Sequence, residues 1–545
     1  MKSRTFFSAI ALVAGLLILL GVAGFWGLTG QNPRSLMTRG GQPIPAAAQF
    51  VPRQAPVMFS LLARPDRLWT LRQMFTSSGE RAKARQEWQS LKNTLAEFVG
   101  WDYETDVRPW LDEEVAIAVT AIDLDHDASN GLQTGYLAVL SCQDGQKARE
   151  ATHLLWQKRA ISGRNLFFET VSGVPLIYDQ KPEKPAFGSL DVFDSAALKL
   201  ESLASAVIGD RYVLLANHPQ VLRQAIATFQ APDVSLAQEA TYRASINTLP
   251  SNRIGWLYAN APTLLTWLGL EEPELVTSLA ETGRRANRLF MSFRANPMGL
   301  LGDTAIAAAP GTTFEQSNRG KANRRPPTQV LDILPAETLF VTSGRNLSHL
   351  LAETADSIGG YRFVQRSLQA FLTALSLPAE TGPTPLWDTI QGEYALGLLA
   401  GKTPTWILAA QASSDSPFSA IDELAQQQGL NVSHVQLGGQ DITAWTQLSL
   451  ILTSPGRPAS LNTKVIGVHT RVKGYEVFAT SLPGLQQVLW AKQEPSLSKQ
   501  PMFAKLLDSL DQPYGSLAYI DWPRLTPLLF NRFPWLRVIE QAGQP

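Results

Sequence analysis

At 545 residues the chain is too long for a single hydrophobic core, and its length predicts two to four domains. Lys and Arg together number 47, as do Asp and Glu, so the chain lacks the positive charge expected of a general nucleic-acid binder. Cys142 is the only cysteine, which excludes an intramolecular disulfide and a cysteine-based zinc site. It follows a strand-like apolar run and is expected to be a buried thiol.

The first feature in chain order is an apolar stretch from Phe6 to Leu28 that contains no charged residue. As a helix it would span about 34 Å, enough to cross a bilayer with some tilt. Lys2 and Arg4 precede it, which favours keeping the short tail in the cytoplasm and exporting the rest. We therefore expect residues 1–28 to be an uncleaved transmembrane anchor. A signal peptide cleaved after Gly21-Val22-Ala23 is the alternative.

Residues 29–49 are rich in Gly, Pro, Gln and Ala, a composition typical of a flexible stalk. Residues 50–308 then alternate between short apolar runs and amphipathic stretches, which predicts a first αβ unit. Its expected helices cover residues 65–74, 80–98 and 146–159, and a further helix begins after His218. Its expected strands are 57–63, 114–122, 135–142, 166–170, 175–178, 204–209, 212–216, 253–259, 288–295 and 300–308.

Residues 309–329 combine Gly, Ser, Asn, Pro and basic side chains and indicate an exposed linker. Residues 330–545 repeat the pattern of the first unit, since residues 211–216 recur as 474–479 and residues 255–260 as 515–521. Many strands are joined by tight turns, which favours antiparallel pairing. The sequence thus predicts an α+β fold: two tandem related units with mainly antiparallel sheets and helices packed on one face, behind one transmembrane helix.

Asp123, Asp125 and Asp127 have the spacing that opens a calcium-binding loop. The rest of that motif is missing, because Ala128 and Thr134 stand where it needs glycine and glutamate. The segment also joins two expected strands instead of two helices. We interpret it as a solvated hairpin turn, with a weak metal site as the alternative.

Aromatic and acidic residues are densest in residues 100–110. Two interpretations stay open for this segment: a packed turn, or a ledge on which exposed Trp101 and Trp110 bind a sugar or a protein partner. The six histidines lack metal-binding spacing, and the dinucleotide and serine-hydrolase fingerprints are absent from the sequence. No catalytic residue and no cofactor is therefore predicted.

Residues 50–57, the turn from Asp106 to Trp110 and residues 208–213, with the anchor and the duplicated body, support a resemblance. Together they resemble the cyanobacterial membrane-anchored family catalogued as domain of unknown function 3352. The resemblance implies a cyanobacterial host and a body in the periplasm or thylakoid lumen. It carries over no catalytic residue.

Duplicated units without a convergent polar site favour a non-enzymatic, membrane-tethered interaction protein, such as an assembly or maintenance factor for a membrane complex. Its expected partners are the membrane, through the N-terminal helix, and a protein, whereas nucleic acid is not expected. Two alternatives remain open. One is a lipid- or sugar-binding protein that uses a cleft between the units, and the other is a hydrolase whose residues meet only in three dimensions.

Overall fold

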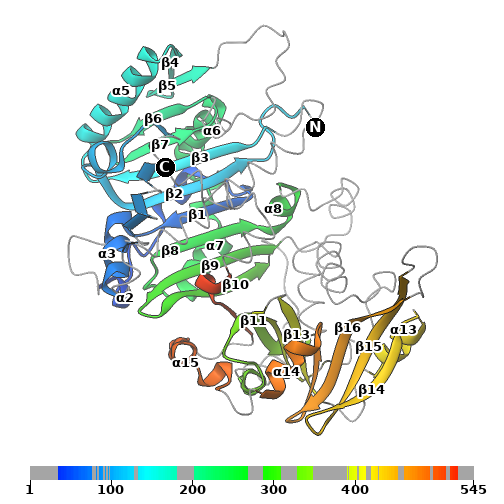
Figure 1. Ribbon diagram of the computed structural model, residues 1–545. Helices are drawn as coiled ribbons and strands as arrows, with labels where there is room; N and C mark the ends of the chain where they lie inside the picture. The colour runs from blue at the N-terminus through cyan, green and yellow to red at the C-terminus, as the bar shows by residue number, and fades with distance from the viewer. Residues whose placement is uncertain are drawn as a thin grey trace. The chain divides into compact units, whose positions relative to one another are not determined.

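The structure is a computed structural model. It describes most of the chain in continuous ranges and, between residues 82 and 99, only scattered helical positions. The main described ranges are 35–75, 100–127, 133–180, 202–267, 287–308, 328–347, 390, 392–401, 404–412, 419–427, 429–451, 460–490, 495–510 and 516–525. These residues divide into two compact units, one on each side of the expected linker. Each unit holds one sheet with packed helices (Figure 1), which confirms the predicted α+β class.

The first unit is built on a ten-stranded sheet in which every pair of neighbours is antiparallel. Its strands are β1 (Val57–Leu61), β2 (Leu111–Ala121), β3 (Gly135–Cys142), β4 (Asn165–Val171), β5 (Val174–Gln180), β6 (Ala204–Ile208), β7 (Tyr212–Ala216), β8 (Gly255–Asn260), β9 (Asn287–Asn296) and β10 (Gly299–Ala308). Across the sheet their order is β10-β9-β8-β1-β2-β3-β7-β6-β5-β4. The helices are α2 (Ser35–Thr38), η1 (Ala46–Phe50), α3 (Pro65–Phe75), η2 (Tyr103–Val107), α5 (Gly145–Ile161), α6 (Pro219–Gln230), η4 (Pro232–Val234), η5 (Leu236–Gln238), α7 (Ala240–Thr248) and α8 (Ala261–Trp267).

The second unit is built on an eight-stranded antiparallel sheet. Its strands are β11 (Thr338–Arg345), β12 (Glu393–Leu399), β13 (Thr405–Gln411), β14 (Asn431–Leu437), β15 (Gln440–Ile451), β16 (Ser460–Val472), β17 (Tyr475–Ala479) and β18 (Leu517–Ile520). The helices are η7 (Gln329–Asp332), α13 (Ser419–Gln427), α14 (Leu482–Trp490), η8 (Leu497–Lys499) and α15 (Pro501–Asp508).

The order of the strands repeats from one unit to the other. Read from β18, the second sheet runs β18-β11-β12-β13-β17-β16-β15-β14. Read from β8, the first runs β8-β1-β2-β3-β7-β6-β5-β4, which places each strand beside the same neighbours. Among the described strands, β9 and β10 have no counterpart in the second unit. The internal duplication expected from the sequence therefore extends to the topology.

Tight turns recur at the same places in both units. The β4–β5 turn contains Ser172 and Gly173 at positive φ, and the β14–β15 turn contains Gly438 and Gly439 at positive φ. The β6–β7 and β16–β17 turns likewise have two consecutive residues of positive φ. In three of these turns the pair is the whole connection, as in the two-residue turn whose twist matches that of the flanking strands, and the β6–β7 turn has one further residue, Arg211. Local turn chemistry thus sets the register of both outer hairpins.

The sheets are covered on both faces, so the expectation of helices on one face only is wrong. In β7, Leu214 and Ala216 pack in the core cluster that contains α6, whereas Val213 and Leu215 pack in the cluster that contains α5. In the second unit α14 and α13 take the corresponding places. Because side chains alternate along a strand, central strands buried on both faces have nearly continuous apolar sequences.

The expected stalk is wrong for residues 35–49, which belong to the first unit. Leu36, Ala47 and Ala48 are fully buried. Gly41 N–H donates to Arg253 O at 2.8 Å, so the segment is hydrogen-bonded to the body as well as packed against it. Small residues are common both in flexible linkers and where two backbones approach closely, and composition does not distinguish the two.

The expected transmembrane segment, residues 1–28, lies outside the described residues. Within the ranges that the structure does describe, no helix is both long and apolar enough to cross a membrane.

Replacing Gly41 by Ala is expected to destabilise the first unit. A Cβ at this position would overlap the backbone carbonyl of Leu62, which cannot move without disturbing β1. We expect Gly41→Ala to lower the free energy of unfolding by about 1–3 kcal/mol, measured by chemical denaturation of the full-length protein in detergent. Gly302→Ala is the control, because its Cβ would lie 3.4 Å from Met291 Sδ, an ordinary contact. Equal stability of the two variants would contradict the close packing of residues 35–49.

Candidate functional site

Trp101 and Trp110 lie in the interior, which contradicts the hypothesis of an exposed binding ledge. Each has an exposed fraction of 1%, and their rings meet edge to face at 5.7 Å between centroids. The indole N–H of Trp101 donates to Ala151 O in α5 at 3.2 Å, and that of Trp110 donates to Asp106 O. Both indoles therefore anchor the turn between α5 and the sheet, and the interpretation as a packed turn is confirmed.

Between the two tryptophans, the chain forms a single π-helical turn, η2. Arg108 N–H donates to Tyr103 O at 2.8 Å, a bond that spans five residues. Asp102 stabilises the start of this turn, because its Oδ1 accepts from the backbone N–H of Glu104 and Thr105, each at 2.9 Å. Isolated π-helical turns are frequent at functional sites, which makes the residues around η2 a candidate site.

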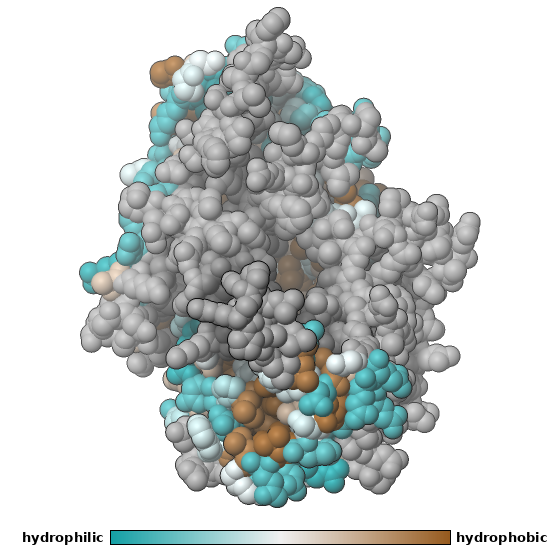
Figure 2. All heavy atoms as spheres, turned by 45° about the vertical axis from the view of Figure 1, so that its right-hand side comes forward, coloured by the Kyte–Doolittle hydropathy of each residue, from teal (hydrophilic) through white to brown (hydrophobic). Residues whose placement is uncertain are grey.

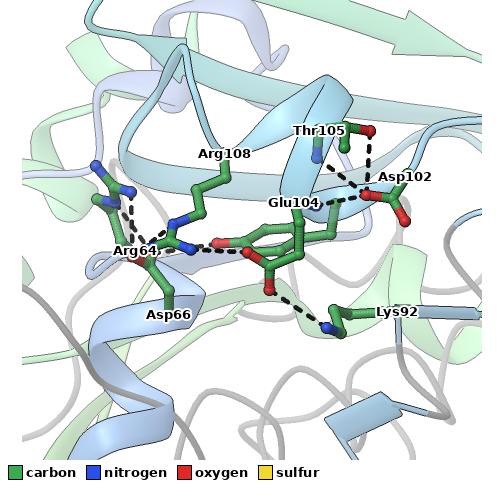
Figure 3. A network of polar contacts seen from close by, with 8 residues as sticks. Arg64, Asp66, Lys92, Asp102, Glu104, Thr105 and Arg108 are labelled. Carbon is green, nitrogen blue, oxygen red and sulfur yellow. Dashed lines mark hydrogen bonds and ion pairs between the residues drawn. The ribbon is translucent and has the colours of Figure 1, made fainter.

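Charged side chains from three elements meet beside this turn (Figure 3). Asp66 of α3 is the most buried, and Arg64 contacts both of its oxygens, at 3.0 and 3.1 Å. The Tyr103 hydroxyl donates to Asp66 Oδ1 at 3.2 Å, and Arg108 Nε lies 3.7 Å from Asp66 Oδ2. Glu104 in turn contacts Arg108 at 2.8 Å and Lys92 at 3.3 Å.

The charges in this network compensate one another. Burial acts to raise the pKa of Glu104, but hydrogen bonds from Arg108 and Lys92 outweigh it and hold the pKa below its usual value. Burial, followed by the charge of Asp66, raises the pKa of Tyr103 well above its usual value. A carboxyl whose pKa is lowered by cationic partners and a phenol whose pKa is raised are both poorly suited to proton transfer near neutral pH. The network therefore fixes η2 against α3 and is not suited to general acid–base chemistry.

Asp123, Asp125 and Asp127, the weak candidate metal ligands, lie between β2 and β3. No group of three metal-ligating side chains lies together in the part of the chain that the structure describes, which includes these three residues. Asp123 Oδ1 accepts from Gln133 N–H at 3.1 Å, and Asp125 Oδ1 accepts from Asp127 N–H at 3.1 Å. These carboxylates stabilise the turn between β2 and β3, as in the hairpin interpretation.

Cys142 is buried, as the sequence predicted, and burial raises the pKa of its thiol to about 12. Compared with its ordinary pKa of 9.0, the reactive thiolate at pH 8 is about a thousandfold rarer. We expect the folded full-length protein to resist a thiol-specific disulfide reagent and to react only after denaturant is added. Rapid labelling of the native protein would show that the structure around the end of β3 opens readily.

A histidine–carboxylate pair lies in the second unit. His469 Nε2 of β16 is 2.9 Å from Asp422 Oδ1 of α13, and Trp445 of β15 donates to the same oxygen at 2.6 Å. The three residues are far apart in sequence, so spacing gave no signal for them. The hydrolase alternative would depend on this pair. Its evident role is structural, because one carboxylate oxygen ties α13 to two strands.

A buried glutamate at the start of β2 contacts the N-terminal segment. Glu114 has an exposed fraction of 1%. Its Oε2 accepts from Ala46 N–H at 2.7 Å, and Ala47 N–H is 3.2 Å from both carboxylate oxygens. The Glu114 backbone is fixed by Ser141, whose Oγ accepts from Glu114 N–H at 2.9 Å. The Glu114 carboxylate thus holds the first two residues of η1 by accepting hydrogen bonds from their backbone N–H groups.

Glu393 occupies the equivalent place at the start of β12, with an exposed fraction of 2%. Its Oε2 accepts from Val330 N–H of η7 at 3.2 Å and from the Tyr475 hydroxyl at 3.0 Å. Arg345 at the end of β11 forms an ion pair with Oε1. Both units therefore use a buried glutamate to hold the short helix that precedes the first strand of the sheet.

The equivalence of the two glutamates follows from the sheet register. Ala116, two residues after Glu114, pairs with Ser60, and Ala395, two residues after Glu393, pairs with Ser343. Both serines are fully buried. The sequence carries a signal for this pair, because residues 114–117 (Glu-Val-Ala-Ile) and 393–396 (Glu-Tyr-Ala-Leu) are similar.

Fold and sites together define a class of protein: a duplicated antiparallel α+β protein whose buried polar groups mainly support the fold. The chain belongs to the family described as "Protein of unknown function (DUF3352)", whose model matches residues 10–545. Neither the curated proteins nor the solved structures contain a match.

Proposed function

We propose that the protein is a membrane-tethered, extracytoplasmic interaction protein that serves in the assembly or maintenance of a membrane complex. The charge-free stretch from Phe6 to Leu28 supports a tether, with the body in the periplasm or thylakoid lumen of a cyanobacterium. The role proposed is binding rather than catalysis, since the polar clusters at η2 and α13 have evident structural roles.

The observation that carries the proposal is the exposed apolar outer edge of the first unit, formed by Ile161, Phe167 and Phe168. Ile161 is 88% exposed and Phe168 is 73% exposed. Phe168 is a residue of β4, and Ile161 ends α5 shortly before that strand. Among the described strands β4 pairs only with β5, so its other side has no strand partner there. Edge strands that carry exposed apolar side chains are prone to pair with other chains, and natural proteins usually block them.

The second unit also exposes apolar side chains. Figure 2 shows hydrophobic residues gathered among hydrophilic ones on its surface. Its exposed apolar side chains include Val435 at 52% in the edge strand β14, Leu448 at 50% and Trp490 at 61%. Because β14 is the counterpart of β4, each unit ends in an edge strand with exposed apolar residues.

Site-specific photocrosslinking in native membranes tests the proposal. A photoreactive phenylalanine analogue at position 168 of the full-length protein is expected to trap a specific protein neighbour. The control carries the analogue at Thr248, an exposed residue of α7 on the same unit, and should trap nothing specific. If position 168 yields no adduct, or the same adducts as position 248, the outer edge is not a binding surface.

The tether is tested separately. Deletion of residues 1–28 is expected to move the protein from the membrane fraction to the soluble fraction after cell disruption. Full-length protein should stay with the membranes in a high-salt wash, because an inserted helix does not depend on charge. Release of the full-length protein by salt would argue for peripheral attachment instead.

A further inference from the structure

The two buried glutamates differ in how their charge is compensated. Glu393 has Arg345 as an ion-pair partner and the Tyr475 hydroxyl as a hydrogen-bond donor. Among the described residues, Glu114 has no cationic partner in hydrogen-bond or ion-pair contact. A buried carboxylate without a countercharge is unfavourable, because the interior solvates charge poorly.

The groups that face Glu114 do not replace a cation. Its own strand contributes Asp112, whose like charge disfavours ionisation, and α7 contributes the phenol of Tyr242. The strands β1 and β3 contribute the hydroxyls of Ser60 and Ser141, and η1 contributes backbone amides.

Arg253, two residues before β8, interacts electrostatically with Tyr242. Its guanidinium donates to the carbonyls of Ile246 and Leu249, at 2.7 and 2.9 Å, and stacks on Trp256. The charge of Arg253 influences the pKa of Tyr242, and its guanidinium is held by hydrogen bonds to backbone carbonyls. The groups that face Glu114 therefore leave its charge uncompensated.

A neutral Glu114 would be well accommodated. Oε2 would continue to accept from Ala46 and Ala47, and a proton on Oε1 would need an acceptor. The hydroxyls of Ser60 and Tyr242 are buried beside it, and neither has a hydrogen-bond partner of normal geometry in the described part of the chain. Ser60 is close enough to Glu114 to lower its pKa, but burial outweighs this effect. A buried polar atom without a hydrogen-bond partner lowers the stability of the fold. A protonated Glu114 could donate a hydrogen bond to one of these two hydroxyls.

We propose that Glu114 is a proton-operated latch, which holds residues 46–50 against the first sheet firmly when its carboxyl is protonated and loosely when it is ionised. Glu393 holds the matching helix η7 through Val330, with Arg345 as the partner that compensates its charge. This inference goes beyond the proposed function, since it requires no particular partner.

The sign of the pH effect follows from burial. Burial, opposed mainly by the Ala47 amide, raises the pKa of Glu114 from 4.5 to about 7. In an opened segment the carboxyl would be hydrated and return toward its ordinary pKa. The closed form therefore binds the proton more tightly than the open form. Closure is favoured fully below about pH 4.5, and this advantage is lost as the pH rises to about 7.

Hydrogen exchange of the full-length protein in detergent, corrected for the intrinsic pH dependence of exchange, tests this inference. Between pH 5 and 7, protection of a peptide covering residues 46–50 is expected to fall by up to about tenfold per pH unit. Protection of residues 329–332, held by Glu393, and of β7 in the same unit should stay constant. A parallel loss in β7 would indicate destabilisation of the whole unit and overturn the latch.

Glu114→Gln provides the matched variant, because the amide keeps an acceptor for Ala46 while removing the titration. Protection of residues 46–50 in this variant is expected to be independent of pH. Unchanged pH dependence in Glu114→Gln would assign the effect to another group and overturn the inference. If the variant does not fold, the comparison of residues 46–50 with 329–332 in the wild type still decides. An equal response of the two segments would refute the proposal.

Discussion

Replacement of Trp101 by Ala is expected to lower the free energy of unfolding by about 3–5 kcal/mol. The indole is 1% exposed, packs edge to face on Trp110 and donates to the Ala151 carbonyl of α5. Its removal leaves a cavity between α5 and the sheet and removes the indole hydrogen bond to α5. Chemical denaturation of the full-length protein in detergent, followed by circular dichroism, measures the loss.

Trp490→Ala is the matched control, because this indole is 61% exposed at the end of α14. Its loss should change stability by no more than about 0.5 kcal/mol. The two variants also separate packing from binding. If Trp101→Ala were as stable as the wild type but lost a binding partner, the hypothesis of a tryptophan ledge would return in place of the packed turn.

Replacement of Arg345 by Met is expected to destabilise the second unit by about 3–5 kcal/mol. The substitution leaves the Glu393 carboxylate, 2% exposed, without its cation. Tyr475 and Val330 would still donate to Oε2, but two neutral donors do not compensate a buried charge. The loss should appear in the unfolding transition of the second unit and leave that of the first unchanged.

Two further variants define the cause. In the double variant Arg345→Met, Glu393→Gln, the buried charge is gone, and most of the lost stability should return. Arg149→Met removes an arginine from an ion pair in which both partners are about half exposed, and it should cost at most about 1 kcal/mol. If the double variant were no more stable than Arg345→Met, lost packing of the arginine stem would be the cause instead.

Local patterns predicted the secondary structure because strands and turns depend on neighbouring residues. The recurrence of residues 211–216 as 474–479 became β7 and β17, each the last strand of a tight hairpin and each followed by a helix. His218 begins α6 as expected, since its Nδ1 accepts from Gln220 N–H at 3.2 Å. The antiparallel topology followed from the short connections between strands.

Burial was harder to predict, because it depends on segments that are distant in the chain. Trp101 and Trp110 are amphipathic side chains whose sequence context is compatible with either a surface or a core position. They are buried because α5 packs over them. Residues 35–49 have the composition of a linker, yet they pack against Leu62 and Arg253, which lie much later in the chain.

The sequence alone was enough to predict the α+β class, the duplication, the hairpins and the buried cysteine. All of these depend on short-range periodicity and turn chemistry. The electrostatic environments of the buried glutamates could not be predicted from the sequence. Glu114 and Glu393 occupy matching positions in two similar sequences, but one lies beside hydroxyls and the other beside Arg345. The charge that a buried carboxylate can carry depends on the groups that folding brings to it, and those groups come from other strands and helices.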